Sequence, residues 1–105
     1  MPLSVGSSVQ TGAFSLTSGD NGTVIYFNAA ANATITLPNN LPAGFNVIVG
    51  QVGAGQATFV PAAGAMLNAR LSKTKTAGQY AEVSLVVRSN VGGAAATYLL
   101  AGDIA

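Results

Sequence analysis

Cysteine, histidine and tryptophan are all missing from this 105-residue chain. Without cysteine there can be no disulfide and no thiolate chemistry. Without histidine the commonest general base and the commonest metal ligand are absent. The three carboxylates, Asp20, Glu82 and Asp103, are far apart in the sequence, whereas a glycosidase needs two that face one cleft. We therefore expect no enzymatic activity, no metal ion and no cofactor.

Charge is scarce as well. Charged residues make up 7% of the chain, against about 25% in a typical soluble domain. Either a surface of small polar and alanine residues hydrates adequately without charge, or much of the surface meets another subunit, since interface cores are poor in charge. The second explanation implies a homo-oligomer or a larger assembly. The net charge of +1 gives no electrostatic reason to expect nucleic acid or a membrane as a partner.

The N-terminal residues 1–12 are small, polar and rich in glycine. They lack the positive and apolar regions of a secretion signal, and no apolar run of the chain approaches the roughly 18 residues of a membrane span. We expect residues 1–12 to form an extended arm or an edge segment. Residues 13–105 are then long enough for one domain.

Short β-type runs alternate with turn residues along the rest of the chain. The expected strands are residues 13–17, 23–28, 33–37, 45–52, 56–60, 65–68, 80–88 and 96–101. Asn21-Gly22 is expected to close a hairpin, and we find no repeat of fixed period. About eight short strands with little or no helix predict an all-β fold, an antiparallel β-sandwich or a jelly-roll-like barrel.

Three of these strands have readable faces. Residues 33–37 (ATITL) alternate, which places Ile35 and Leu37 inward. Residues 45–52 are almost continuously apolar, which predicts a central strand covered on both faces. Residues 80–88 alternate, with Ala81, Val83, Leu85 and Val87 on the inner face and Tyr80 on the outer one.

Two prolines precede the most hydrophobic strand. Pro38 and Pro42 cannot donate ladder hydrogen bonds, and each disfavours helix in the residue before it. With two asparagines between them they predict a stiff corner between residues 33–37 and 45–52.

Few side chains could bind a partner. Arg70, Lys73 and Lys75 form a small basic cluster, which is either a solvated loop, a contact with an acidic neighbouring subunit, or a weak nucleic-acid footprint. Tyr26, Tyr80 and Tyr98 could stack on a sugar, but within strands they are also typical of core or interface packing. The stretch GQVGAGQA looks like a phosphate loop, yet a strand instead of a helix follows it, so we interpret it as a turn.

The segment from Ile35 to Asp103 resembles a module of structural proteins of tailed bacteriophages. The resemblance rests on ITLPNNLPAGFNVIVGQVGAGQATFVPAAGAMLNA, TAGQYAEVSLVVRS and TYLLAGDIA. It covers about two thirds of the chain. In that family the last strand often carries tryptophan, where this chain has Tyr98-Leu99-Leu100.

The resemblance implies a role in a virion. The family's modules occur in tail fibres, head fibres and capsid-surface proteins, usually in threefold assemblies. Because the module fills almost the whole chain, we expect a capsid decoration, or cement, protein: a homotrimer that binds the major capsid protein on the outer surface of the head. Such a protein is made in the cytoplasm of the bacterial host, and residues 1–12 would lie on a neighbouring subunit or on the shell.

An alternative implied by the same family is a receptor-binding tip of a tail or head fibre, with a host-surface glycan as its ligand. For the subunit interface we predict six residues: Pro38, Pro42, Phe45, Arg70, Lys73 and Lys75.

Overall fold

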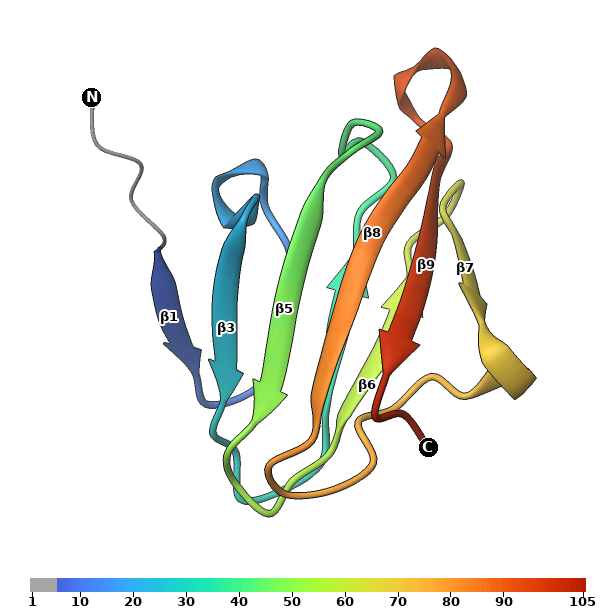
Figure 1. Ribbon diagram of the computed structural model, residues 1–105. Coiled ribbons are helices and arrows are strands. Elements are labelled where there is room, and N and C mark those ends of the chain that lie inside the picture. Colours follow the sequence, from blue (N-terminus) through green and yellow to red (C-terminus); the bar gives the residue numbers. More distant parts are fainter. Residues whose placement is uncertain (1–5) are drawn as a thin grey trace.

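The computed structural model describes residues 6–105, which form nine β-strands and three short 3-10 helices (Figure 1). The strands are β1 (Ser7–Gln10), β2 (Phe14–Ser15), β3 (Thr23–Phe27), β4 (Ala33–Leu37), β5 (Asn46–Gln51), β6 (Ala57–Pro61), β7 (Met66–Ala69), β8 (Glu82–Asn90) and β9 (Ala96–Gly102). The helices are η1 (Ser18–Asp20), η2 (Arg70–Ser72) and η3 (Val91–Gly93). The all-β prediction is confirmed. No helix among these residues is long and apolar enough to cross a membrane.

The strands form two facing sheets around one core. The larger sheet has the order β1-β3-β5-β8-β9-β7, and the smaller sheet has the order β2-β4-β6. In Figure 1 the six-stranded sheet lies in front of the smaller one. Apolar side chains from both sheets, among them Ile25, Val49 and Phe59, belong to a single buried cluster between them.

Strands β1 to β6 alternate between the sheets and run parallel to their neighbours. Each consecutive pair, β1–β2, β3–β4 and β5–β6, is therefore one coil of a short stack. From β3–β4 to β5–β6 every residue pairs with the residue 24 positions later, from Thr23 with Val47 to Leu37 with Pro61. The chain thus has a 24-residue structural repeat, and the expectation of no repeat was wrong.

This stacking changes the expected architecture. Of the seven strand pairings among residues 6–105, five are parallel and two are antiparallel, so the antiparallel sandwich or jelly roll is not confirmed. The hairpin expected at Asn21-Gly22 is also wrong, because β2 and β3 belong to different sheets. Instead, the side-chain oxygen of Asn21 accepts a 3.1 Å hydrogen bond from the backbone N–H of Asn46 in the next coil. The turn chemistry is present, but it links coils.

The glycine turn after β5 packs directly on the turn of the coil before it. A Cβ atom on Gly53 would lie 2.4 Å from the carbonyl oxygen of Ala29, and one on Gly55 would lie 2.2 Å from that of Ala31. Real Cβ atoms do not approach backbone this closely, so both positions require glycine. The interpretation of this stretch as a turn is confirmed, and its glycines serve coil stacking.

The last third of the chain closes the structure. Strands β8 and β9 form a hairpin between β5 and β7, and β8 runs antiparallel to both of its neighbours. The segment 74–77 then crosses to the smaller sheet, where the Phe59 N–H donates to the Thr74 carbonyl and the Thr76 N–H donates to the Ala57 carbonyl. This segment covers the edge of β6, which would otherwise be open to another strand.

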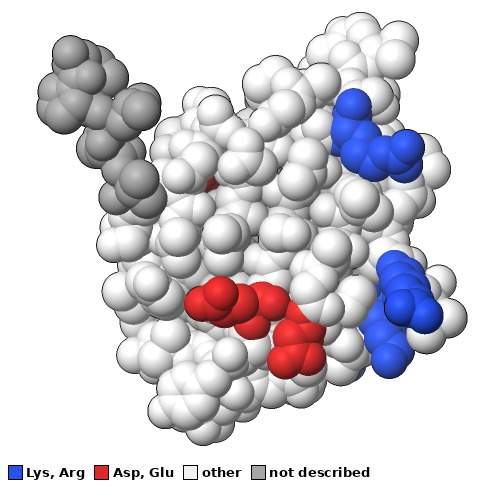
Figure 2. All heavy atoms as spheres, in the orientation of Figure 1, with Lys and Arg blue, Asp and Glu red and all other residues white. Residues whose placement is uncertain are grey.

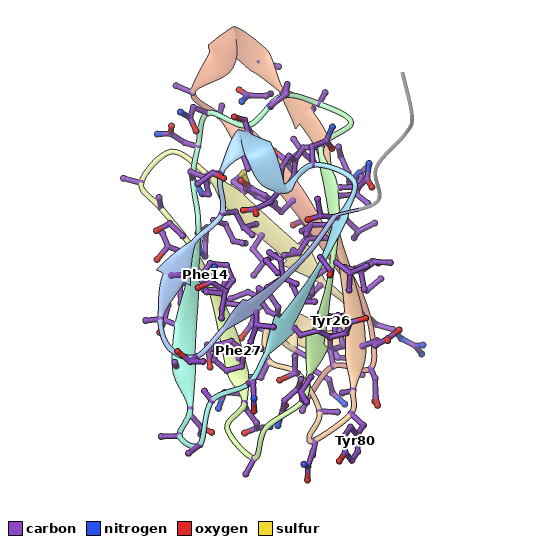
Figure 3. All side chains as sticks on the ribbon, turned by 90° about the vertical axis from the view of Figure 1, so that its left-hand side faces the viewer. Phe14, Tyr26, Phe27 and Tyr80 are labelled. Atoms are coloured by element: carbon purple, nitrogen blue, oxygen red, sulfur yellow. The ribbon has the colours of Figure 1, made fainter. Side chains whose placement is uncertain are left out.

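The predicted faces are mostly correct. Ile35 and Leu37 are fully buried, as are alternate residues of β8. The prediction that residues 45–52 are covered on both faces was wrong, because Ile48 on β5 is 41% exposed. Phe27 points between the sheets and Phe14 packs against the same core, whereas Tyr26 projects from the opposite side of its strand (Figure 3).

The expected N-terminal arm divides into two parts. Residues 1–5 lie outside the described residues. Ser7–Gln10 forms β1 and pairs in parallel with β3 from Ser7–Val24 to Gln10–Phe27, so this part is the edge segment that the sequence analysis allowed. The domain therefore begins before residue 13.

Candidate functional site

The outer face of the six-stranded sheet carries exposed apolar side chains on every strand. These residues are Val9, Tyr26, Ile48, Val86, Leu99 and Met66. Some are cross-strand neighbours, such as Val9 with Tyr26 and Val86 with Leu99. They occupy the outward positions of strands whose inward positions fill the core. Most of this face is uncharged (Figure 2), so it can lose water at little electrostatic cost.

Acidic and basic side chains are separated on the surface. In Figure 2 the acidic groups gather over the lower part of the sheet face, and the basic groups lie at its right-hand edge. The acidic group comprises Glu82, at the start of β8, and Asp103, just after β9. The Asp103 N–H donates a 3.1 Å hydrogen bond to the Glu82 carbonyl, which holds these two exposed residues together.

Two tyrosines stand beside this acidic pair. Tyr26, Tyr80 and Glu82 line a shallow hollow of about 160 Å³. Gly50 forms part of the floor, where an added Cβ would lie 3.5 Å from the Tyr26 ring and 3.6 Å from Cγ of Glu82. The hollow therefore combines aromatic surface with a carboxylate. Both tyrosine rings lie on the outer side of the six-stranded sheet (Figure 3).

Tyr80 is held in an unusual conformation. It was expected in a strand, but β8 begins only at Glu82. Tyr80 instead has φ +70°, a left-handed conformation that costs a non-glycine residue roughly 1–2 kcal/mol. Its N–H donates to the Gln51 carbonyl, and the side chain of Gln79 donates a 3.0 Å hydrogen bond to the Val52 carbonyl. These bonds clamp the turn to the end of β5 and leave the Tyr80 side chain 76% exposed.

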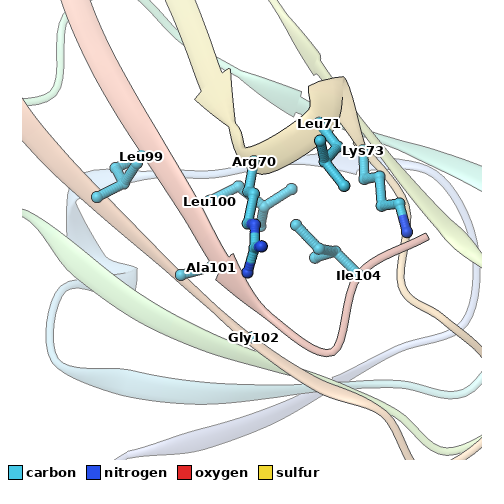
Figure 4. Close-up of a pocket in the computed structure, with 8 residues that line it drawn as sticks. All are labelled: Arg70, Leu71, Lys73, Leu99, Leu100, Ala101, Gly102 and Ile104. Carbon is cyan, nitrogen blue, oxygen red and sulfur yellow. The ribbon is translucent and has the colours of Figure 1, made fainter.

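A larger hollow lies at the edge formed by η2, β9 and the C-terminal residues (Figure 4). It has a volume of about 430 Å³ and is lined by Arg70, Leu71, Lys73, Leu99, Leu100, Ala101, Gly102 and Ile104. Leu71 is 74% exposed. Two consecutive residues in its wall, Leu71 and Ser72, have positive φ angles of 59° and 56°. An apolar floor with two cations beside it can accept an apolar group that carries negative charge.

The six residues predicted for the interface do not come together. Arg70 and Lys73 share the larger hollow, whereas Lys75 does not line it. Lys75 instead exchanges backbone hydrogen bonds with Ala105. Phe45 is 2% exposed and belongs to the core, so its side chain is not on the surface of this chain.

The two prolines lie elsewhere, in the connection between β4 and β5. This corner is fixed from the β8–β9 hairpin. The side-chain amide of Asn90 donates hydrogen bonds to the carbonyls of Asn39 (3.0 Å) and Leu41 (2.8 Å), and the Tyr98 hydroxyl donates to the Pro38 carbonyl. The predicted stiffness therefore has partners that the sequence did not reveal.

The tyrosines have separate roles. Tyr98 is fully buried, so core packing is the correct interpretation for it, and burial raises its pKa to about 12. Tyr26 and Tyr80 are exposed and remain available for a partner. The sequence analysis did not select Glu82, Asp103 or Leu71 as binding residues. The isolated acid on the outer face of residues 80–88 was the one available signal.

The described residues offer binding surfaces and no assembled catalytic group. Within residues 6–105 no three histidine, cysteine or acidic side chains come together as metal ligands. The Asp20 carboxylate accepts a 2.9 Å hydrogen bond from the Thr17 N–H and so caps η1. No family model, curated protein or solved structure matches this chain.

Proposed function

We propose that this chain is a virion structural protein of a tailed bacteriophage: a capsid decoration protein that binds the outer surface of the head shell as a trimer and stabilises it. The observation that carries the proposal is the outer face of the six-stranded sheet, where each strand presents an apolar side chain to solvent. Exposed apolar surface of this extent is typical of a binding face.

The size of the chain is compatible with such a role. A stable protein interface buries about 800 Å² on each partner. The chain exposes 5560 Å² in total, so one interface of that size would cover about one seventh of its surface. The sparse charge is then a property of surface that is covered in the assembly.

The assignment to a phage head rests on the resemblance of residues 35–103 to phage structural modules. On this proposal the partners are other copies of the chain and the major capsid protein, and the location is the capsid surface after synthesis in the host cytoplasm. A rigid two-layered subunit that contacts neighbouring capsid proteins would lower the free energy of the closed shell through mass action.

The direct test uses heads of the parent phage prepared without this protein. Purified chain is added, and co-sedimentation measures how much binds; the temperature at which DNA-filled heads release DNA measures stabilisation. We expect saturable binding and a higher release temperature. Heads that bind none of the added protein would contradict the proposal.

A second candidate is supported by the hollow between Tyr26 and Tyr80. Aromatic faces beside a carboxylate are groups that can stack on a sugar ring and accept its hydroxyl hydrogens, which fits a receptor- or glycan-binding tip of a fibre. Binding on a glycan array that is lost in Tyr26→Ala and Tyr80→Ala would favour this function. The same array without binding, together with attachment to heads, would favour decoration.

A further inference from the structure

Backbone strain is concentrated at two surface turns. Among residues 6–105, three residues other than glycine have positive φ angles: Leu71, Ser72 and Tyr80. Leu71 and Ser72 belong to the wall of the larger hollow, and Tyr80 stands beside Glu82. Strain of this kind persists where the surrounding structure fixes it, and it often marks a functional surface.

The two turns also display large apolar side chains. Tyr80 is 76% exposed and Leu71 is 74% exposed, although side chains of this kind normally seek burial. The turn around Tyr80, together with Glu82 and Asp103, is called the knob below. The hollow lined by Arg70, Leu71 and Lys73 is called the socket.

Knob and socket are complementary in chemistry. The knob offers one aromatic ring with two carboxylates, and the socket offers an apolar floor with a guanidinium and an ammonium group. A volume of about 430 Å³ leaves room for a phenol ring. An arginine can also hold a carboxylate through two parallel hydrogen bonds.

The two surfaces lie close together on one molecule. Asp103 of the knob stands in the chain between Gly102 and Ile104, which both line the socket. A knob therefore cannot fill the socket of its own chain, but it can fill that of another copy. Contacts between two different patches generate a ring when the rotation between copies closes.

We propose that copies of this protein associate by inserting the Tyr80 knob of one copy into the Arg70–Lys73 socket of the next. This inference rests on the proposed function, because it supplies the contact that builds the trimer. Closure after three copies places the knobs and sockets around the threefold axis. The apolar sheet face then remains available for the shell.

Charge reversal tests the contact. One variant reverses the knob (Glu82→Lys with Asp103→Lys), a second reverses the socket (Arg70→Glu with Lys73→Glu), and a third carries all four changes. All four side chains are exposed, so the fold should tolerate them, and circular dichroism checks this. Arg88→Glu is the matched control, since Arg88 is an exposed residue of β8 outside both surfaces.

Light scattering after size exclusion at low salt gives the mass of each variant. We expect three times the 10.4 kDa chain mass for the natural chain and for Arg88→Glu. Either reversed variant should dissociate at protein concentrations at least tenfold higher, and the fourfold variant should recover. Tyr80→Ser should weaken association by a similar factor.

Three results would overturn the contact: a natural chain that stays monomeric at millimolar concentration, reversed variants that assemble normally, or a folded fourfold variant that does not recover. Attachment to heads is measured separately. A chain that binds heads without this contact retains the proposed function and loses only the inference. A chain that forms the ring and ignores heads loses the proposed function alone.

Discussion

The Thr76 hydroxyl donates a 2.6 Å hydrogen bond to Oε1 of Gln51 inside the protein. Both side chains are almost completely buried, and the same hydroxyl accepts a 3.0 Å hydrogen bond from the Ala57 N–H. This pair joins the end of β5 in one sheet to the segment that covers β6 in the other.

Removing this hydroxyl should destabilise the fold. Thr76→Val leaves the Gln51 oxygen and the Ala57 N–H buried without partners, and each such group costs roughly 1–3 kcal/mol. We expect a loss of about 2–4 kcal/mol in the free energy of unfolding by urea, followed by circular dichroism. Thr76→Ser should recover most of it. Thr74→Val changes the same groups two residues earlier, and an equal loss there would show that the network is not the cause.

The glycine turn should be equally sensitive. Gly53→Ala places a methyl group against the Ala29 carbonyl, and overpacking of this kind typically costs about 1–3 kcal/mol. Gly12→Ala is the control, because an added Cβ there meets nothing within 4 Å, and its effect should stay within about 0.5 kcal/mol. Similar midpoints in thermal unfolding for both variants would contradict the stacked arrangement of the coils.

Tyr98 should make stability depend on alkaline pH. Its pKa in the folded protein is about 12, against about 10 in the unfolded chain. The unfolded chain therefore loses this proton first, so stability is fully present below pH 10 and falls as the pH rises toward 12. Tyr98→Phe should lower stability by about 1 kcal/mol at neutral pH through the lost hydrogen bond, and it should remove this part of the alkaline decline. Tyr80→Phe, at an exposed position, should leave the decline in place.

The outer sheet face can be tested with one pair of variants. Ile48 and Val60 are 41% and 43% exposed, both are β-branched, and they lie on strands of the larger and the smaller sheet. Ile48→Asp should reduce binding to heads at least tenfold, whereas Val60→Asp should bind like the natural chain. Co-sedimentation over a range of protein concentrations measures both affinities. Equal losses in the two variants would mean that the six-stranded face is not the binding surface.

Strand positions were largely predictable from the sequence, and strand directions were not. The expected strand at residues 33–37 coincides with β4, and most others agree to within one or two residues. Period-two alternation reports which face is buried, and it is the same for parallel and antiparallel neighbours. The direction is decided by how the turns carry the chain from one sheet to the other.

The 24-residue repeat escaped for a related reason. Between residues 23–37 and 47–61 only three positions are identical, Ala30 with Ala54, Ala33 with Ala57 and Thr34 with Thr58. The two coils share the burial pattern of their strands and the small size of their turn residues, and several side chains satisfy those requirements equally well.

The candidate site was predicted only in part. Arg70 and Lys73 stand together because they flank one tight turn, and this cluster was visible in the sequence. The exposure of Tyr80 was not, because the alternation of residues 80–88 continues through it while its backbone turns into the left-handed region. Its position depends on hydrogen bonds to Gln51 and Val52, about 30 residues away in the chain.

The constant offset between β3–β4 and β5–β6 also determines how this molecule could change in length. A duplication of 24 residues would add one strand to each sheet and lengthen the stack by about 4.8 Å. An insertion of 23 or 25 residues would instead turn every inward side chain of the new coil to the outside. Viable relatives of this protein should therefore differ in size by whole coils, and the chain acts as a ruler whose smallest division is 24 residues.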